Sequence, residues 1–216
     1  MCNLYDIGPG RQRNRNEWEA TITAAFDGIQ KNYGIRKTDL GPVIVQSEQD
    51  KMEAHQMRWG FRRSFNPAVN NARTDKLDGP WATPWKEKRR CLIPMSTFYE
   101  WTGPTGGKQT FAFEFPKQDD FIWAAGIWEP GDNEPAYSML TTDASPSVSR
   151  IHDRMPALLD PATFMEFLSA SDPRHLLAPW AGPLDIFRCE NPLKGTTTTH
   201  KGPQRQDLLP GFDGID

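Results

Sequence analysis

Four short strand-like runs follow one another between residues 98 and 142, and they constrain the fold more than any other feature of the chain. The runs are Phe98 to Trp101, Thr110 to Phe115, Phe121 to Trp128 and Ala136 to Thr142. Two glycine-containing segments, Gly103 to Gly107 and Gly131 to Asn133, supply turns between them. Short strands in succession with turns between them favour an antiparallel, barrel-like sheet.

The rest of the chain adds further strands and a few short helices to this sheet. With 216 residues it fits one domain, and its 19 Pro and 17 Gly indicate many turns. A helix is predicted from the Asn16 cap to near Gly34, a shorter one within residues 80–90, and another starting at Asp160-Pro161. Further strands are predicted at residues 42–46, 57–61, 155–159 and 184–189, with Gly60 at a bulge or close approach. Residues 66–73 are expected to begin as a loop.

Charge is unevenly distributed along the chain. The formal net charge is −3, yet residues 58–90 hold nine basic residues against three acidic ones, a local surplus of six. The same stretch contains Trp59, Trp81 and Trp85. Cations interleaved with rings are typical of a groove that binds single-stranded nucleic acid. A solvated charged face over core aromatics explains the composition equally well.

The three cysteines, Cys2, Cys91 and Cys189, form no paired spacing, and no CxxC or His-rich cluster indicates a metal site. We therefore expect reduced thiols, no metal and no cofactor, with Cys91 and Cys189 serving in packing. The amino terminus lacks a basic-then-apolar leader, and no run approaches a membrane span of about 18 apolar residues. The expected location is the cytoplasm, and the nucleoid if the source is bacterial.

Cys2 has a distinctive chemistry available to it. Its small side chain allows an aminopeptidase to remove Met1, which leaves cysteine with a free amine two carbons from its thiol. The amine condenses with an aldehyde to an imine, and the thiol then closes a five-membered thiazolidine. Ordinary pKa values of about 7.7 to 8.0 for an α-amine and about 8.5 for a cysteine thiol bring both groups near neutral pH. The alternative to this reactive role is that Cys2 is only a small apolar residue near a strand.

Several short motifs follow one another along the chain after this cysteine. The motifs are Cys2; Arg58-Trp59-Gly60; Asn71-Ala72-Arg73; Arg90-Cys91-Leu92-Ile93-Pro94; Phe98-Tyr99-Glu100-Trp101; Ala125-Gly126-Ile127-Trp128; and His152-Asp153-Arg154-Met155-Pro156. Their order and approximate spacing resemble those of the SOS response associated peptidase family. The resemblance covers about residues 2–193. The tail, residues 194–216, matches nothing in the pattern, and its low apolar content predicts a mobile or loosely docked segment.

The resemblance implies a single α+β domain with a barrel-like sheet core and flanking short helices. It also implies a monomeric, self-modifying enzyme that binds single-stranded DNA containing an abasic site and links Cys2 to the ring-opened sugar. The product would be a thiazolidine that shields the lesion in the DNA damage response. Peptidase action would be limited to removal of Met1. Abasic-site lyase activity and contacts with replication-fork proteins are left open.

The residue chemistry assigns candidate roles around Cys2. Glu100 lies among apolar neighbours that would raise its pKa, so it can act as an acid and a base near pH 7. Asn71 can hold the amine or a sugar oxygen, and His152 can protonate the ring oxygen or assist reversal of the crosslink.

A second set of residues is predicted to bind DNA. Arg73 and Arg154 suit phosphate, and Arg58 contributes to the basic stretch. Trp59 and Trp101 could stack on bases or belong to the core.

The sequence also departs from the family pattern. Asn3 and Leu4 replace a usual Gly-Arg, and Arg11, Arg13 or Arg15 could substitute for that arginine.

Two other interpretations stay open. An amino-terminal-nucleophile amidotransferase would also use Cys2, and would split glutamine. A non-covalent single-strand binder would have no use for it. Glutaminase activity supports the first interpretation, and binding to abasic DNA that does not survive denaturation supports the second.

Overall fold

The computed structural model of the chain describes residues 2–8, 32–116, 121–131, 134–194 and 207–208. Most of the helix predicted between Asn16 and Gly34 lies outside these ranges, as do Arg11, Arg13 and Arg15. Most residues after 194 lie outside them as well, so the domain boundary at 193 stays a prediction. No helix in the described part of the chain is both long enough and apolar enough to cross a membrane.

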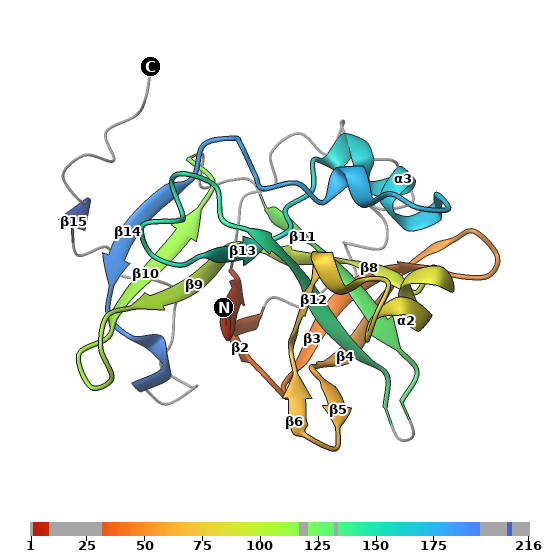
Figure 1. Cartoon of the computed structure of the whole chain (residues 1–216), viewed down its shortest axis with the longest axis horizontal. Coiled ribbons are helices and arrows are strands. Elements are labelled where there is room, and N and C mark those ends of the chain that lie inside the picture. The colour runs from red at the N-terminus through yellow and green to blue at the C-terminus, as the bar shows by residue number, and fades with distance from the viewer. Residues whose placement is uncertain (1, 9–31, 117–120, 132–133, 195–206, 209–216) are drawn as a thin grey trace.

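A ring-like sheet forms one half of the domain (Figure 1). Its strands pair in the order β11-β8-β3-β4-β12-β13, β12 also pairs with β11, and β7 lies along β12. The strands are β3 (Leu40–Gln46), β4 (Met52–Trp59), β7 (Asn71–Arg73), β8 (Arg90–Met95), β11 (Ile122–Glu129), β12 (Ala136–Asp143) and β13 (Arg154–Pro156). Because β4 meets β12 over only two residue pairs, the ring is not fully closed.

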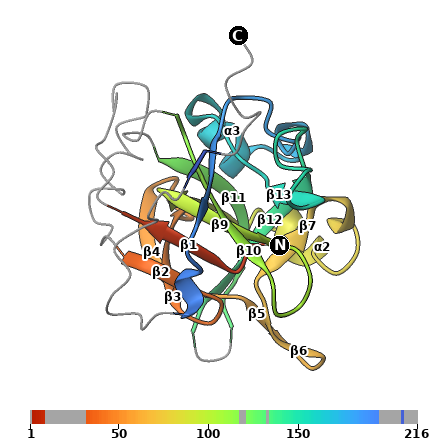
Figure 2. The ribbon, with the colours of Figure 1, turned by 90° about the vertical axis from the view of Figure 1, so that its left-hand side faces the viewer.

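A second, antiparallel sheet carries the start of the chain. Its order is β15-β14-β10-β9-β1-β2. The strands are β1 (Leu4–Ile7), β2 (Asn32–Arg36), β9 (Thr97–Thr102), β10 (Gln109–Glu114), β14 (Asp185–Cys189) and β15 (Asp207–Leu208). Figure 2 shows β1 next to β9, across the strands of the ring-like sheet.

The helices are short and lie around the sheets. They are α2 (Ala82–Lys86), α3 (Phe164–Ser169) and the 3₁₀ turns η2 (Thr74–Lys76), η3 (Pro161–Thr163), η4 (Arg174–Leu176) and η5 (Pro192–Lys194). Asp160 caps η3 as predicted, because its Oδ1 accepts a 2.9 Å hydrogen bond from the Ala162 amide. The predicted fold class, a single α+β domain with a barrel-like sheet, is confirmed.

Two features differ from the sequence-based expectation. Residues 66–73, expected to begin as a loop, form β6 (Asn66–Val69) and β7, and β7 pairs with β12 in parallel. The sheet is therefore not wholly antiparallel, since β4 also runs parallel to β12. Gly60 separates β4 from β5 (Phe61–Arg63) at φ +116°, and a Cβ there would lie 3.2 Å from the Ala68 backbone, so the predicted close approach is confirmed.

The aromatic residues mostly fill the core. The rings of Phe98 and Phe113 stack with centroids 4.6 Å apart, and Trp123 packs edge-to-face on Phe164. Phe65 is different, because 79% of it is exposed in the turn of the β5–β6 hairpin, which projects from the domain in Figures 1 and 2.

Candidate functional site

Cys2 lies directly before β1 and is almost fully enclosed. Only 1% of the residue is exposed, and its thiol donates a 3.2 Å hydrogen bond to the Leu4 carbonyl. Burial, and then the negative charge of Glu100, raise the pKa of the Cys2 thiol to about 12. The thiol is therefore protonated at neutral pH and needs a base to become nucleophilic.

Two neighbouring asparagines hold the backbone of Cys2. The side-chain amides of Asn70 and Asn71 both donate to its carbonyl oxygen, at 3.0 Å and 2.8 Å. Their segment is fixed by the parallel register that pairs Asn71 with Met139 of β12. The Oδ1 atom of Asn71 is buried and has no hydrogen-bond partner among the described residues, so it is available to a substrate donor.

Glu100 reaches the same place from β9. Antiparallel pairing of β1 with β9 sets Tyr5 opposite Phe98, which brings the next part of the β9 ladder alongside Cys2. Glu100 is buried, and burial raises the pKa of its carboxyl to about 7. The negative charge of Asp153 raises that pKa further, whereas a backbone hydrogen bond with Trp101 lowers it. Such a carboxyl can both give and accept a proton at neutral pH.

His152 lies in the turn before β13. Its Nδ1 accepts a 3.0 Å hydrogen bond from the Arg154 amide, and the Asp153 carboxylate lies 2.9 Å from the same atom. One nitrogen cannot accept the amide hydrogen and carry its own proton, so these two contacts exclude each other. Because burial lowers the pKa of His152 and Asp153 is solvent-exposed, we assign the neutral ring with its proton on Nε2.

The four predicted catalytic residues thus come from four different segments of the fold. Cys2 and Asn71 are in direct contact, and Glu100 lies close enough for its charge to act on the Cys2 thiol. Asp153, the neighbour of His152, lies close enough to Glu100 for its negative charge to raise the pKa of that carboxyl. Their catalytic roles remain predictions.

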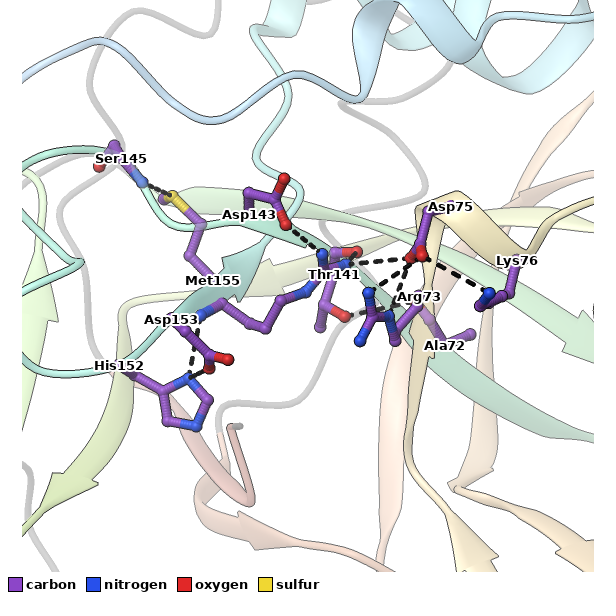
Figure 3. Close-up of polar contacts among 11 residues, drawn as sticks. Ala72, Arg73, Asp75, Lys76, Thr141, Asp143, Ser145, His152, Asp153 and Met155 are labelled. Carbon is purple, nitrogen blue, oxygen red and sulfur yellow. Dashed lines mark hydrogen bonds and ion pairs between the residues drawn. The ribbon is translucent and has the colours of Figure 1, made fainter.

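The two arginines predicted to bind phosphate have different environments. Figure 3 shows Arg73 beside Asp75. The Arg73 side chain is 50% exposed and forms a two-pronged ion pair with Asp75, at 2.9 Å and 3.0 Å. Arg154 is buried, donates to the Asp143 carboxylate and the Thr141 carbonyl, and lies 3.8 Å from Asp75. Arg73 therefore reaches solvent, whereas Arg154 links β13 to β12.

Trp59 and Arg58 are in the interior in this structure. Trp59 is 0% exposed, its ring lies edge-to-face with Tyr5 at 5.0 Å and parallel to Tyr137 at 6.4 Å, and its Nε1 donates to the Asn70 carbonyl. Arg58 is also buried, and it donates to the backbone carbonyls of Gly60 and Pro67. Neither side chain is positioned to meet a base or a phosphate without rearrangement.

Unlike the fully buried Trp59, Trp101 is still a candidate for stacking on a DNA base. It is half-buried against a small cluster that includes Leu4 and Tyr99, and its indole nitrogen has no hydrogen-bond partner in the described part of the chain. Its stacking on a base therefore stays a prediction.

Several basic residues of the stretch 58–90 have acidic partners. Arg62 pairs with Glu134 at 2.9 Å, Arg63 pairs with Glu129 at 2.6 Å, and Arg89 pairs with Glu87. Because Glu87 belongs to the stretch itself, these pairs offset only part of its basic surplus. The rings of Trp59, Trp81 and Trp85 are buried, which fits the alternative of a charged surface over core aromatics.

Two residues were missed in the sequence. Asn70 has the same contact to Cys2 as Asn71, and the adjacent pair of asparagines was the available signal. Phe65, which is 79% exposed, was not singled out, although it lies close to Arg62 and Arg63 in the sequence. Within the described ranges, no group of three or more His, Cys, Asp or Glu residues is arranged to hold a metal ion.

The fold and the site together define an α+β protein with a cysteine at position 2, enclosed by two amides and a carboxyl with a raised pKa. The family model for the SOS response associated peptidase (SRAP) matches residues 1–190, and the chain belongs to that family.

Named relatives are also similar to the chain. The chain is 33% identical over 170 residues to "Abasic site processing protein HMCES" of Gallus gallus, covering 60% of this chain and 51% of the relative. For the Xenopus tropicalis protein of the same name the identity is 28% over 199 residues, with coverages of 74% and 58%. The chain thus spans about half the length of these curated relatives.

The fold also matches a solved structure from Bacteroides thetaiotaomicron. Its TM-score is 0.70 at 20% identity, covering 94% of this chain and 99% of that one.

Proposed function

We propose that this protein binds single-stranded DNA at abasic sites and forms a covalent thiazolidine between Cys2 and the ring-opened sugar. The observation that carries the proposal is the convergence of Asn71 and Glu100 on a cysteine that becomes the first residue when Met1 is removed. The names of the abasic site processing relatives support it. The wider biological role is a contribution to the DNA damage response.

The first step is condensation of the Cys2 amine with the aldehyde carbon of the sugar. The amine nitrogen bonds to that carbon, and the resulting hydroxyl must leave as water to give an imine. Glu100 in its protonated form supplies the proton for that departure, which its pKa of about 7 permits. Asn71 Oδ1 is the acceptor available to orient the amine or the hydroxyl.

The second step closes the ring. Loss of water leaves a protonated imine, whose nitrogen keeps one hydrogen. Because the pKa of the thiol is raised to about 12, the newly formed Glu100 carboxylate is the base that takes the thiol proton. The sulfur adds to the imine carbon, the carbon–nitrogen double bond becomes single, and the nitrogen becomes a neutral amine. The whole sequence releases one water and returns Glu100 to its protonated starting state. Neutral His152 offers its Nε2–H as a hydrogen-bond donor to the sugar ring oxygen, in ring opening or in reversal of the crosslink.

Contacts to the DNA would come from exposed groups around the site. Arg73 offers a solvent-accessible guanidinium for phosphate, with Asp75 as its partner in the free protein. Phe65 offers an exposed ring at a hairpin tip next to Arg62, which suits stacking on a base better than the buried Trp59. Arg154 supports the site from the interior.

The proposal is tested with the purified protein and two oligonucleotides of one sequence, one abasic and one intact, on a denaturing gel. A shifted band is expected only with the abasic strand, and Cys2→Ala should remove it while leaving native binding. Shifted bands with both strands, or with neither, would refute the proposal. Glutaminase activity lost in the Cys2 variant would instead favour the amidotransferase. Lyase activity, a monomeric state, replication-fork partners and a cytoplasmic or nucleoid location remain predictions.

A further inference from the structure

Asn70 contacts Cys2 in a way that the chemistry above does not use. The residue is 8% exposed, and its Nδ2 donates to the Cys2 carbonyl at 3.0 Å and to Asn3 Oδ1 at 3.2 Å. A side-chain amide nitrogen carries two hydrogens, so both bonds can form together. Asn70 therefore holds the two residues at the beginning of the described chain, one by its backbone and one by its side chain.

The backbone of Asn70 is itself fixed by two donors. Its carbonyl accepts hydrogen bonds from Trp59 Nε1 at 2.9 Å and from the Met139 amide at 3.0 Å. Trp59 in turn packs edge-to-face on Tyr5 of β1. These contacts form a closed circuit through Cys2, Asn70, Trp59 and Tyr5. Trp59 therefore supports β1 in two ways, through Asn70 and through Tyr5.

We propose that Asn70 is a positioning residue for the Cys2 nucleophile and that Trp59 acts through Asn70 rather than on DNA. This inference rests on the proposed function. The Cα atom of Cys2 carries both the amine and the thiol-bearing carbon, and it is bonded directly to the carbonyl that Asn70 and Asn71 hold. Two donors from adjacent residues restrict rotation of that carbonyl more than one donor does. Amine, thiol and Glu100 then keep a fixed arrangement, which ring closure requires.

A purely structural role for Asn70 predicts a different outcome. It would change the melting temperature and leave the rate of crosslinking at saturating DNA unaltered in the folded variant. A positioning role lowers that saturating rate without a matching loss of DNA affinity.

The sharpest variant is Asn70→Asp, because it keeps the shape and replaces the donating nitrogen by an oxygen that cannot donate when ionised. Its matched control is Asn191→Asp. Asn191 Oδ1 accepts from the Leu193 amide at 3.0 Å, and an aspartate retains that acceptor. The experiment measures the crosslinking rate of the full chain at saturating abasic oligonucleotide, with native affinity measured separately in a Cys2→Ala background and folding checked by melting temperature.

We expect Asn70→Asp to lower the saturating rate by about tenfold or more, and Asn191→Asp to leave it unchanged. Asn70→Ala, which adds no charge, should also lower the rate. Trp59→Phe keeps a ring against Tyr5 but removes the indole donor, and it should lower the rate by a smaller factor without weakening DNA binding. A wild-type rate in any folded Asn70 variant would overturn the inference. If the wild-type protein itself does not crosslink, the proposed function fails instead.

Discussion

The side-chain amide of Asn71 donates a 2.8 Å hydrogen bond to the carbonyl oxygen of Cys2, 69 positions earlier in the chain. Asn71 belongs to the ring-like sheet, where it pairs with Met139, whereas Cys2 leads into β1 of the second sheet. Glu100 reaches Cys2 from β9, the neighbour of β1. The site therefore exists only when the two sheets are packed together, so its reactivity reports on the whole fold.

Cys2→Ser should separate the two chemical steps. Serine is also small enough for Met1 removal, and it keeps the amine but lacks the thiol that closes a thiazolidine. We expect no crosslink that survives denaturation, and a crosslink that appears when borohydride is added to reduce the imine. The measurement is a denaturing gel with and without the reductant. Equal, reductant-independent crosslinking by the serine variant would show that the thiol has no role.

Glu100→Gln should slow crosslinking by about a hundredfold, the lower range for loss of a general acid–base group. The pKa of the Glu100 carboxyl is raised to about 7, so the wild-type rate should change with pH around that value. The glutamine cannot titrate, and its rate should lose that dependence. Rates measured from about pH 5.5 to about pH 8.5, a range that brackets this titration, provide the test. An identical profile in both proteins would exclude Glu100 as the acid and base.

Glu100→Gln should also change how the unfolding free energy depends on pH. The folded-state pKa of Glu100 lies above the unfolded value, so the folded state binds more protons, and stability decreases as pH rises between the two. The raised pKa corresponds to about 3 kcal/mol of wild-type unfolding free energy, lost from about pH 4 to about pH 8. Urea unfolding at several pH values should show that the unfolding free energy of Glu100→Gln lacks this decrease. The same pH dependence in both proteins would contradict the raised pKa of Glu100.

Phe65→Ala should weaken reversible binding of single-stranded DNA by about 1–3 kcal/mol, the usual effect of losing one stacking ring. The ring is 79% exposed, so its removal should barely change the melting temperature. Leu40→Ala, another exposed apolar side chain, is the matched control and should bind normally. Fluorescence anisotropy in a Cys2→Ala background measures both. Equal affinities for all three proteins would exclude the hairpin tip from the DNA contact.

Arg73 and Arg154 should respond differently to replacement by alanine. Loss of the exposed Arg73 should reduce the salt dependence of DNA binding by about 0.7 in the log–log slope, as expected for one phosphate contact. Loss of the buried Arg154 removes its bonds to Asp143 and Thr141 and should lower the unfolding free energy by about 2 kcal/mol. The reverse pattern, with Arg73 affecting only stability, would contradict these roles.

The sequence predicted the four strands between residues 98 and 142 because each is a short run rich in aromatic or β-branched residues. Asp160-Pro161 likewise predicted a helical cap that is present. The parallel pairing of β7 could not be predicted, because a register between residues 71 and 139 overrides the local loop preference of an Asn- and Pro-containing segment.

The sequence identified some residues of the site and left others ambiguous or unnoticed. The motifs identified Cys2, Asn71 and Glu100, which the fold brings together. Trp59 was ambiguous, because the same ring next to an arginine suits a groove or a core, and only the packing against Tyr5 and Tyr137 distinguishes them. Asn70 lies outside the motifs, and its position next to Asn71 was the one sequence signal for its contact with Cys2.

The most direct measurement is the intact mass of the denatured product formed with an abasic oligonucleotide. Thiazolidine formation at residue 2 predicts the mass of the chain without Met1, plus the oligonucleotide, minus one water. A crosslinked species that still carries Met1 would contradict it, because the Cys2 amine would then be an amide and unable to form the imine.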